Sequence, residues 1–153
     1  MLIGGKIMAT IYEMVNEYKL KYPGTVAWRI QKHAKVIEDY LNPGEEVIYA
    51  FCAQKNDNWC DVFSSSVIAL TNKRLLIGQK RVLWGSFYTQ VTPDLYNDME
   101  IYKGLIFGRI TIDTVKEKIV LTNLSKSSLD EIETAISEFM MQEKKKYKDA
   151  KEE

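Results

Sequence analysis

Apolar positions in the first forty residues recur every three or four positions, which is the spacing of one face of an α-helix. The first series ends before the Pro23-Gly24 turn and comprises Ile7, Ile11, Met14, Val15 and Tyr18. The second series ends at Asn42-Pro43-Gly44 and comprises Val26, Ile30, Ala34, Ile37 and Leu41. The pattern therefore predicts two amphipathic helices joined by a short turn.

Beyond residue 46 the period changes to short apolar runs separated by turn-forming residues, which is typical of β-strands. Ile110 and Ile112, for example, alternate with polar residues, the pattern of a strand with one buried face. The expected strands cover residues 47–53, 62–70, 75–78, 82–91, 99–103, 105–113 and 116–122. Seven short strands at this spacing favour a small antiparallel barrel or sandwich.

A last amphipathic helix follows the strands, with an apolar stripe made of Leu129, Ile132, Ala135, Ile136, Phe139 and Met140. Ser128 and Glu131 have the spacing of a capping box, which predicts the start of this helix. From Glu143 onward the charge density rises and the stripe stops, so we interpret residues 144–153 as a charged tail.

Charge and composition narrow the range of functions. The 21 Lys and Arg residues balance the 21 Asp and Glu residues, and this zero net charge argues against nucleic acid as the main partner. The N-terminus lacks the basic start and the uninterrupted apolar run of a signal peptide, and no stretch has the ~20 apolar residues of a membrane span. We therefore expect a cytoplasmic protein.

The reactive residue types form no recognisable catalytic or metal-binding pattern. Cys52 and Cys60 are expected to be reduced structural thiols, with a bridge across a hairpin as the minority interpretation. His33 is the only histidine, and its place beside an apolar stripe indicates packing rather than catalysis. The serine run at residues 64–66 has no nucleophile elbow around it. The sequence thus predicts neither an enzyme nor a cofactor.

Three segments carry a resemblance to a known family: residues 66–77 (SVIALTNKRLLI), residues 104–112 (GLIFGRITI) and the lead-in at residues 41–47 (LNPGEEV). Together with the order of seven strands and a C-terminal helix, they resemble bacterial pleckstrin-homology-like (PH-like) domains over about residues 41–141. The resemblance implies an α+β, mainly β, fold: a seven-stranded antiparallel barrel or sandwich capped by the C-terminal helix. We expect three parts, a helical pair at 1–42, a PH-like domain at 43–143 and the tail at 144–153.

Local residues fit the turns of such a small barrel. Asn72 tolerates the left-handed conformation that a hairpin turn requires. Gly104 and Gly108 permit sharp bends or a close approach of the backbone.

The candidate partner surface consists of Trp28, Lys55, Trp59, Lys73 and Arg74. Trp59 either anchors a partner or folds back to cap the barrel, and Trp28 packs against the first helix or against another subunit. Lys73 and Arg74, like Lys80-Arg81 across the same strand, are either solvated strand ends or an anion-contacting edge. Lys55 is the one basic residue in its polar loop, which disfavours specific recognition of a multiply charged inositol phosphate.

The function expected first is a non-catalytic interaction module that recognises a protein or peptide. The alternative is peripheral contact with an anionic membrane, which the run Lys144-Lys145-Lys146 would favour. The two helical stripes at the N-terminus also suggest a homo-oligomer formed through these helices.

Overall fold

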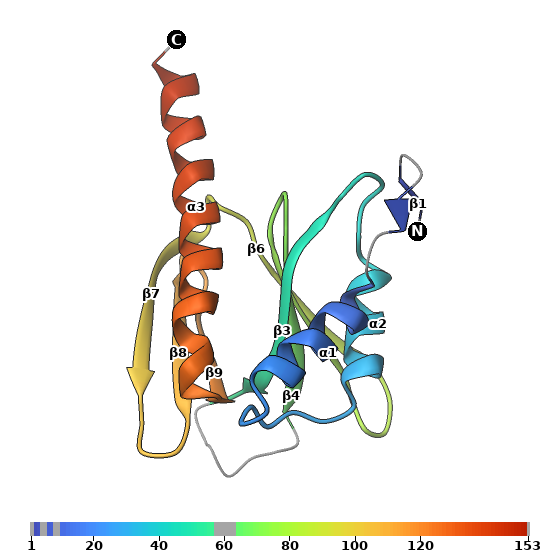
Figure 1. The fold of residues 1–153 in the computed structure, drawn as a ribbon. Helices are drawn as coiled ribbons and strands as arrows, with labels where there is room; N and C mark the ends of the chain where they lie inside the picture. Colours follow the sequence, from blue (N-terminus) through green and yellow to red (C-terminus); the bar gives the residue numbers. More distant parts are fainter. Residues whose placement is uncertain (1, 4–5, 8–9, 57–63, 153) are drawn as a thin grey trace.

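The computed structural model describes the backbone of residues 2–3, 6–7, 10–56 and 64–152 (Figure 1). Its helices are α1 (Ile11–Lys21), α2 (Ile30–Glu38), the 3₁₀ turn η1 (Lys126–Ser128) and α3 (Leu129–Lys151). The strands of the large sheet are β3 (Val47–Lys55), β4 (Ser65–Thr71), β5 (Leu75–Lys80), β6 (Ser86–Val91), β7 (Tyr96–Lys103), β8 (Gly108–Thr114) and β9 (Lys118–Leu124). A separate two-stranded ribbon pairs β1 (Leu2–Ile3) with β2 (Lys6–Ile7).

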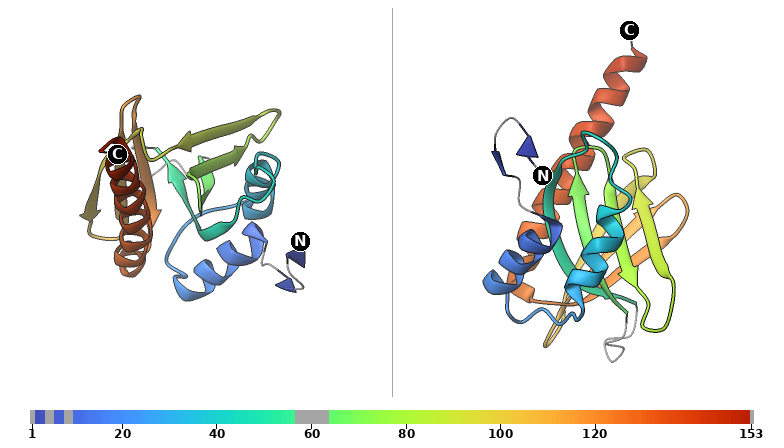
Figure 2. Two further views of the ribbon diagram at one scale, coloured as in Figure 1. Left: turned by 90° about the horizontal axis from the view of Figure 1, so that it is seen from above. Right: turned by 90° about the vertical axis from the view of Figure 1, so that its right-hand side faces the viewer.

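The large sheet is antiparallel throughout, in the order β6-β5-β4-β3-β9-β8-β7. Among the described residues, its two halves, β3–β6 and β7–β9, pair where Gln54 and Lys55 of β3 meet Thr122 and Leu121 of β9. The sheet folds at this short junction, so that the two halves face different directions (Figure 2). The predicted mainly β architecture, with seven strands, a C-terminal helix and two N-terminal helices, is confirmed.

The N-terminal helices belong to the same core as the sheet. α1 packs on β3, and α2 packs on β4 and β5 (Figure 1). Val15, Ala34 and Ile37 are fully buried in this interface, and every residue of β4 is buried as well. The apolar stripes are thus covered by the chain's own sheet, so they give no support to self-association, which stays a prediction.

The first helix starts later than its apolar stripe indicated. Ile7 lies in β2, and α1 begins at Ile11 because Thr10 caps it. The Thr10 hydroxyl accepts a hydrogen bond from the Glu13 N–H at 3.1 Å, and the Glu13 carboxylate accepts one from the Thr10 N–H at 2.9 Å. This reciprocal pair is a capping box.

The capping box predicted at Ser128 and Glu131 is wrong. Ser128 makes no side-chain cap; its hydroxyl donates to the Ser125 carbonyl at 2.7 Å and accepts from the Tyr18 hydroxyl at 2.8 Å. Glu131 instead accepts hydrogen bonds from Lys21 and from the Tyr49 hydroxyl. Both side chains therefore fasten α3 to distant parts of the chain rather than to its own first turn.

The second helix is shorter than its stripe. Val26 precedes it outside any helix or strand, and its N–H donates to the Asn123 carbonyl at 2.9 Å. α2 begins after Arg29, whose φ of 55° lies in the left-handed region, and ends at Glu38, before Leu41.

The β4–β5 turn does not use the left-handed conformation expected at Asn72. Among the described residues, positive φ values occur at Arg29, Gly44, Gly85 and Asn123. Asn72 acts through its side chain, whose Oδ1 accepts the Glu46 N–H at 3.1 Å. The asparagine therefore ties the turn to the start of β3.

The C-terminal helix α3 has 23 residues and extends past the sheet (Figure 1). Its first half is buried through Leu129, Ile132, Ile136 and Met140. Gly108 allows the close approach of its first turn, because a Cβ there would lie 2.5 Å from Leu129 Cδ1. None of the helices in the described part of the chain combines the length and the apolar character needed to cross a membrane.

Gly78 sets the distance between α2 and β5, and we predict that Gly78→Ala destabilises the fold. A Cβ at this position would lie 2.6 Å from Ile37 Cγ1 and 3.1 Å from the His33 carbonyl oxygen, so the helix would have to move. Overpacking of this kind costs about 1–3 kcal/mol of unfolding free energy, measurable by urea denaturation. Gly24→Ala is the matched control, because its Cβ would meet Ser125 at an ordinary 3.6 Å; equal stability of the two variants would contradict the prediction.

Candidate functional site

The sequence-predicted surface residues do not form one surface. Lys55 ends β3, and the Trp28 N–H donates to Ser65 Oγ at the start of β4, so both lie at one end of these strands. Lys73 and Arg74 lie in the β4–β5 turn at the opposite end, as the pairing of Val47 with Thr71 requires. Trp59 and Cys60 fall outside the described residues. Trp28 is 58% exposed and is not packed into the α1 interface.

Arg74 is a structural residue. Its guanidinium makes a two-pronged ion pair with Glu45, at 2.9 Å from Nε and 3.1 Å from Nη2, and also donates to the Tyr88 hydroxyl and the Tyr40 carbonyl. Burial opposes ionisation of Glu45, but hydrogen bonds from Arg74, the Asn42 N–H and Thr71 outweigh it and lower the pKa of its carboxyl. With its donors engaged, this side chain holds the ends of α2, β4 and β6 together rather than facing a partner.

An apolar loop that the sequence analysis assigned to a strand stands in solvent. Residues 81–85 connect β5 and β6, and we call Val82, Leu83 and Trp84 the β5–β6 tip; they are 66%, 81% and 78% exposed. The Arg81 N–H donates to the Gly85 carbonyl at 3.1 Å, and Gly85 has a φ of +85°. The signal in the sequence was the turn-forming Gly85 directly after the apolar run.

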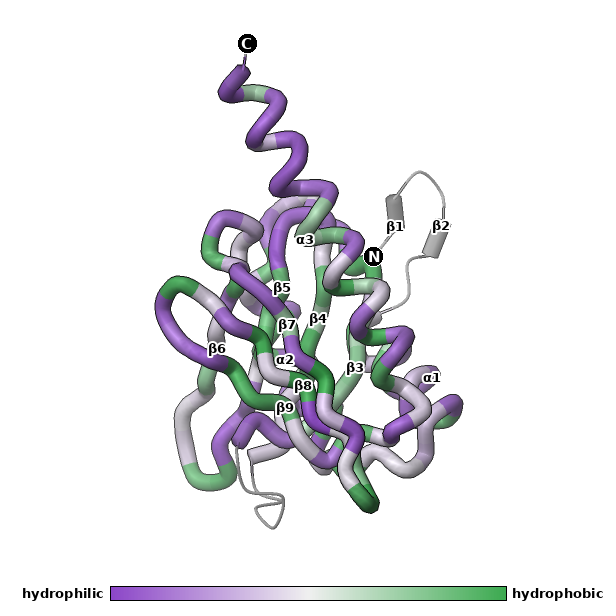
Figure 3. The backbone as a smooth tube through the Cα atoms, turned by 90° about the vertical axis from the view of Figure 1, so that its left-hand side faces the viewer, coloured by the Kyte–Doolittle hydropathy of each residue, from purple (hydrophilic) through white to green (hydrophobic). Residues whose placement is uncertain are grey.

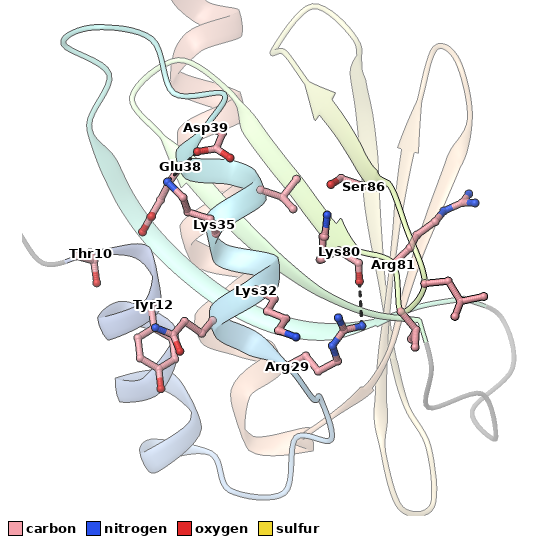
Figure 4. A pocket seen from close by; sticks show the side chains of 14 residues that line it. Thr10, Tyr12, Arg29, Lys32, Lys35, Glu38, Asp39, Lys80, Arg81 and Ser86 are labelled. Atoms are coloured by element: carbon pink, nitrogen blue, oxygen red, sulfur yellow. Dashed lines mark hydrogen bonds and ion pairs between the residues drawn. The ribbon is translucent and has the colours of Figure 1, made fainter.

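A groove opens between α2 and this loop (Figure 4). Its volume is about 780 Å³, and Val82, Leu83 and Val36 supply the apolar part of its wall. Five cations and two acids also line it: Arg29, Lys32, Lys35, Lys80, Arg81, Glu38 and Asp39. We call it the α2 groove.

The cations of the α2 groove are mostly unbalanced. Lys35 pairs with Asp39 at 2.9 Å on the exposed face of α2. In the described part of the chain no carboxylate makes an ion pair with the other four, Arg29, Lys32, Lys80 and Arg81. The groove therefore presents net positive charge beside the apolar tip, although the chain as a whole is neutral.

Arg29 adopts a conformation that is costly for its residue type. A side chain other than glycine or asparagine in the left-handed region carries about 1 kcal/mol or more of strain. Its guanidinium donates to the Lys80 carbonyl at 3.4 Å, which lays it across the floor between α2 and β5 (Figure 4). The strained backbone thus directs a cation into the groove.

His33 joins the two walls of the groove. Its Nδ1 accepts the Lys80 N–H at 2.8 Å, and the residue is only 3% exposed. Burial, reinforced by the nearby charge of Arg29, lowers the pKa of this imidazole from 6.5 to about 4. His33 is therefore neutral at physiological pH, in line with the predicted packing role.

Metal binding and thiol chemistry find no support in the described residues. These residues contain no group of three His, Cys, Asp or Glu side chains that could hold a metal ion. Cys52 is fully buried in β3, and burial raises the pKa of its thiol to about 12, which makes it unreactive. Its predicted alternative partner, Cys60, lies outside the described residues.

The comparison with known families decides the affiliation of the fold. A family model described as bacterial PH domain matches residues 41–138. The chain belongs to the bacterial PH domain family. This confirms the resemblance drawn from the sequence motifs, and PH domains are in general interaction modules rather than enzymes. None of the curated proteins matches the chain significantly.

One solved structure shares this fold, and a second is reported as a weaker similarity. The C-terminal domain of an unknown protein from Leishmania infantum superposes with a TM-score of 0.53 at 17% identity, covering 70% of this chain and 93% of that one. A pleckstrin homology domain from Shewanella amazonensis superposes with a TM-score of 0.49 at 12% identity, covering 82% and 98%.

The family match divides the α2 groove. The β5–β6 tip lies inside the matched segment, whereas α1 and α2 precede it. One wall of the groove is therefore part of the matched segment, and the other comes from a helix that precedes it.

We predict that protonation of His33 destabilises the PH domain between about pH 6.5 and pH 4. In this window the unfolded chain binds a proton at His33 while the folded chain does not, so unfolding free energy falls as the pH falls. We expect a loss of about 1–3 kcal/mol by urea denaturation. His33→Gln should remove the part of this slope above about pH 5, since the carboxyl contributions of Glu45 and Glu131, whose pKa values are lowered from 4.5, are lost mainly below that pH. An unchanged slope in His33→Gln would contradict the assignment.

Proposed function

We propose that this PH domain is a peripheral module that docks on anionic membrane surfaces through the β5–β6 tip and the α2 groove. The observation that carries the proposal is the juxtaposition of three exposed apolar side chains with four cations that lack a carboxylate partner among the described residues. An apolar projection bordered by cations matches a bilayer surface, which has acyl chains beneath anionic headgroups.

The energies are of the right size for reversible attachment. Removing a Val or Leu side chain from water is worth about 1.5–3 kcal/mol, and tryptophan prefers the headgroup region. Each lysine or arginine near an anionic surface adds about 1 kcal/mol. A cytoplasmic location, as predicted from the sequence, would present the anionic leaflet of the bilayer.

The prediction of a protein partner depended on residues that the structure shows to be used within the chain itself. The apolar stripes of α1 and α2 are buried in the chain's own core, and Arg74 is engaged by Glu45. Trp28 remains exposed, but it lies at the same end of β4 as the β5–β6 tip, where it can contact a membrane as well. A protein or peptide partner stays a prediction, and the membrane is the function that we propose first.

Vesicle co-sedimentation tests the apolar part of the site. The full chain should bind vesicles of phosphatidylcholine with phosphatidylserine, and bind phosphatidylcholine alone much less. Leu83→Glu should weaken this binding by about tenfold or more, because a charge replaces an inserting leucine. Met141→Glu is the matched control: Met141 is 68% exposed, on α3 far from the tip, and should leave binding unchanged. Equal binding of both variants would contradict the docking site.

The charge of the groove is tested with a second matched pair. Lys32→Gln with Lys80→Gln removes two groove cations, whereas Lys144→Gln with Lys146→Gln removes two from the C-terminal helix. The first double variant should bind anionic vesicles about tenfold more weakly and lose part of the salt dependence. If the second double variant has the larger effect, the membrane contact lies on the tail and not in the groove.

A further inference from the structure

A second apolar hairpin tip lies at the same end of the molecule. Leu105 is 93% exposed and Ile106 is 66% exposed; we call this pair the β7–β8 tip. In Figure 1 and in the right panel of Figure 2 the β5–β6 and β7–β8 loops both form the lower end of the molecule. In Figure 3 both loops end in green, hydrophobic segments at this end.

The β7–β8 tip is built tightly, and its two residues are unusual for such a turn. The Gly104 N–H donates to the Phe107 carbonyl at 3.0 Å, which leaves Leu105 and Ile106 as the two central residues. A Cβ at Gly104 would lie 2.8 Å from the Phe107 oxygen, so the glycine permits this closure. Central positions of short hairpins normally carry Gly, Asn or Asp. Two large aliphatic residues there serve neither the turn nor the core.

Cations accompany this tip as they accompany the first one. The Lys126 ammonium donates to the Leu105 carbonyl at 3.1 Å, which places a positive charge directly beside the exposed leucine. Lys103 and Arg109 flank the turn on β7 and β8, and both are exposed. The Lys103 ammonium makes an ion pair with Asp130 at 3.6 Å. The Arg109 guanidinium lies over the Tyr102 ring, with its Cζ 4.8 Å from the ring centroid.

We propose that the β7–β8 tip is a second membrane anchor, so that the PH domain docks by two apolar prongs in one fixed orientation. The inference rests on the proposed function and extends it. The two prongs belong to different halves of the folded sheet, β3–β6 and β7–β9, which are joined by the pairing of β3 with β9. We expect both tips to bind an anionic bilayer, because each has apolar side chains at its end and cationic side chains at its base.

Two prongs define which side of the molecule faces away from the bilayer. α3 starts at the docking end and runs away from it, so its C-terminus points into solvent (Figure 1). Lys144 follows Leu129 by fifteen residues, a rise of about 22 Å along the helix. This distance exceeds the screening length of about 8 Å at physiological salt. The Lys144-Lys145-Lys146 run is thereby excluded from the contact.

The experiment compares two double variants of the full chain with equal change of charge. Leu105→Glu/Ile106→Glu alters the β7–β8 tip, and Val115→Glu/Met141→Glu alters exposed apolar residues elsewhere. Val115 is 66% exposed and follows the opposite end of β8, which makes it a matched position. We expect about a tenfold or greater loss of binding to phosphatidylserine vesicles for the first variant and none for the second. Unchanged thermal unfolding checks that both variants fold.

A second measurement reports insertion directly. An environment-sensitive dye is attached to Leu105→Cys or to Val115→Cys in a Cys60→Ser background, since the buried Cys52 thiol does not react. Phosphatidylserine vesicles should shift the emission of the dye at residue 105 to the blue and leave the dye at residue 115 unchanged.

The outcomes separate the two proposals. If the unaltered chain does not bind phosphatidylserine vesicles, the proposed function fails and the second anchor with it. If the chain binds and Leu83→Glu abolishes binding while Leu105→Glu/Ile106→Glu does not, the proposed function stands and the second anchor is wrong. A loss of binding without a dye shift at residue 105 also overturns the anchor, because the tip then does not enter the bilayer.

Discussion

The close contact between α2 and β5 is the constraint on which the candidate site depends. Gly78 lets the helix approach the strand, and His33 satisfies the Lys80 N–H at the end of that strand. An N–H left without a partner at this partly buried joint would cost up to about 1–3 kcal/mol. Because this joint fixes the helix against the strand, the α2 cations lie beside the β5–β6 loop in one geometry. A bacterial PH core without this helix would keep the loop and lose the opposite wall of the groove.

The two ends of the β4 and β5 strands differ in how their side chains are satisfied. At the β4–β5 turn a buried ion pair between Arg74 and Glu45, with Tyr40 stacked on Tyr88 at 3.9 Å, closes the structure with polar and aromatic contacts. At the other end large apolar side chains are left in water, at a cost in solvation that packing does not recover. This difference between the two ends is what the proposed docking on a membrane surface would require.

The periodicity of apolar residues was sufficient to predict the architecture of the fold, but it did not predict the candidate docking site. Seven strands and three helices follow from alternating or helical apolar spacing, which burial enforces. The same periodicity wrongly assigned Val82 and Leu105 to strands, whereas both lie in hairpin loops. A run of apolar residues does not show whether the chain turns within it. The sequence also predicted that the Ser128 hydroxyl caps α3, but this hydroxyl instead accepts a hydrogen bond from Tyr18, which is distant in the sequence. A tertiary contact thus overrode the local signal at the start of α3.

The zero net charge of the chain does not contradict the proposed docking on an anionic surface, but it bears on how such docking would work. Charges further than about 8 Å from the bilayer are screened at physiological salt, so the balance over the whole chain has little influence. What counts is the charge within contact range, where Lys32 and Lys80 make no ion pair with a described carboxylate. A neutral chain also lacks long-range attraction, and attachment then needs apolar insertion as well as charge. The combination of exposed apolar tips and local cations in this PH domain supplies both.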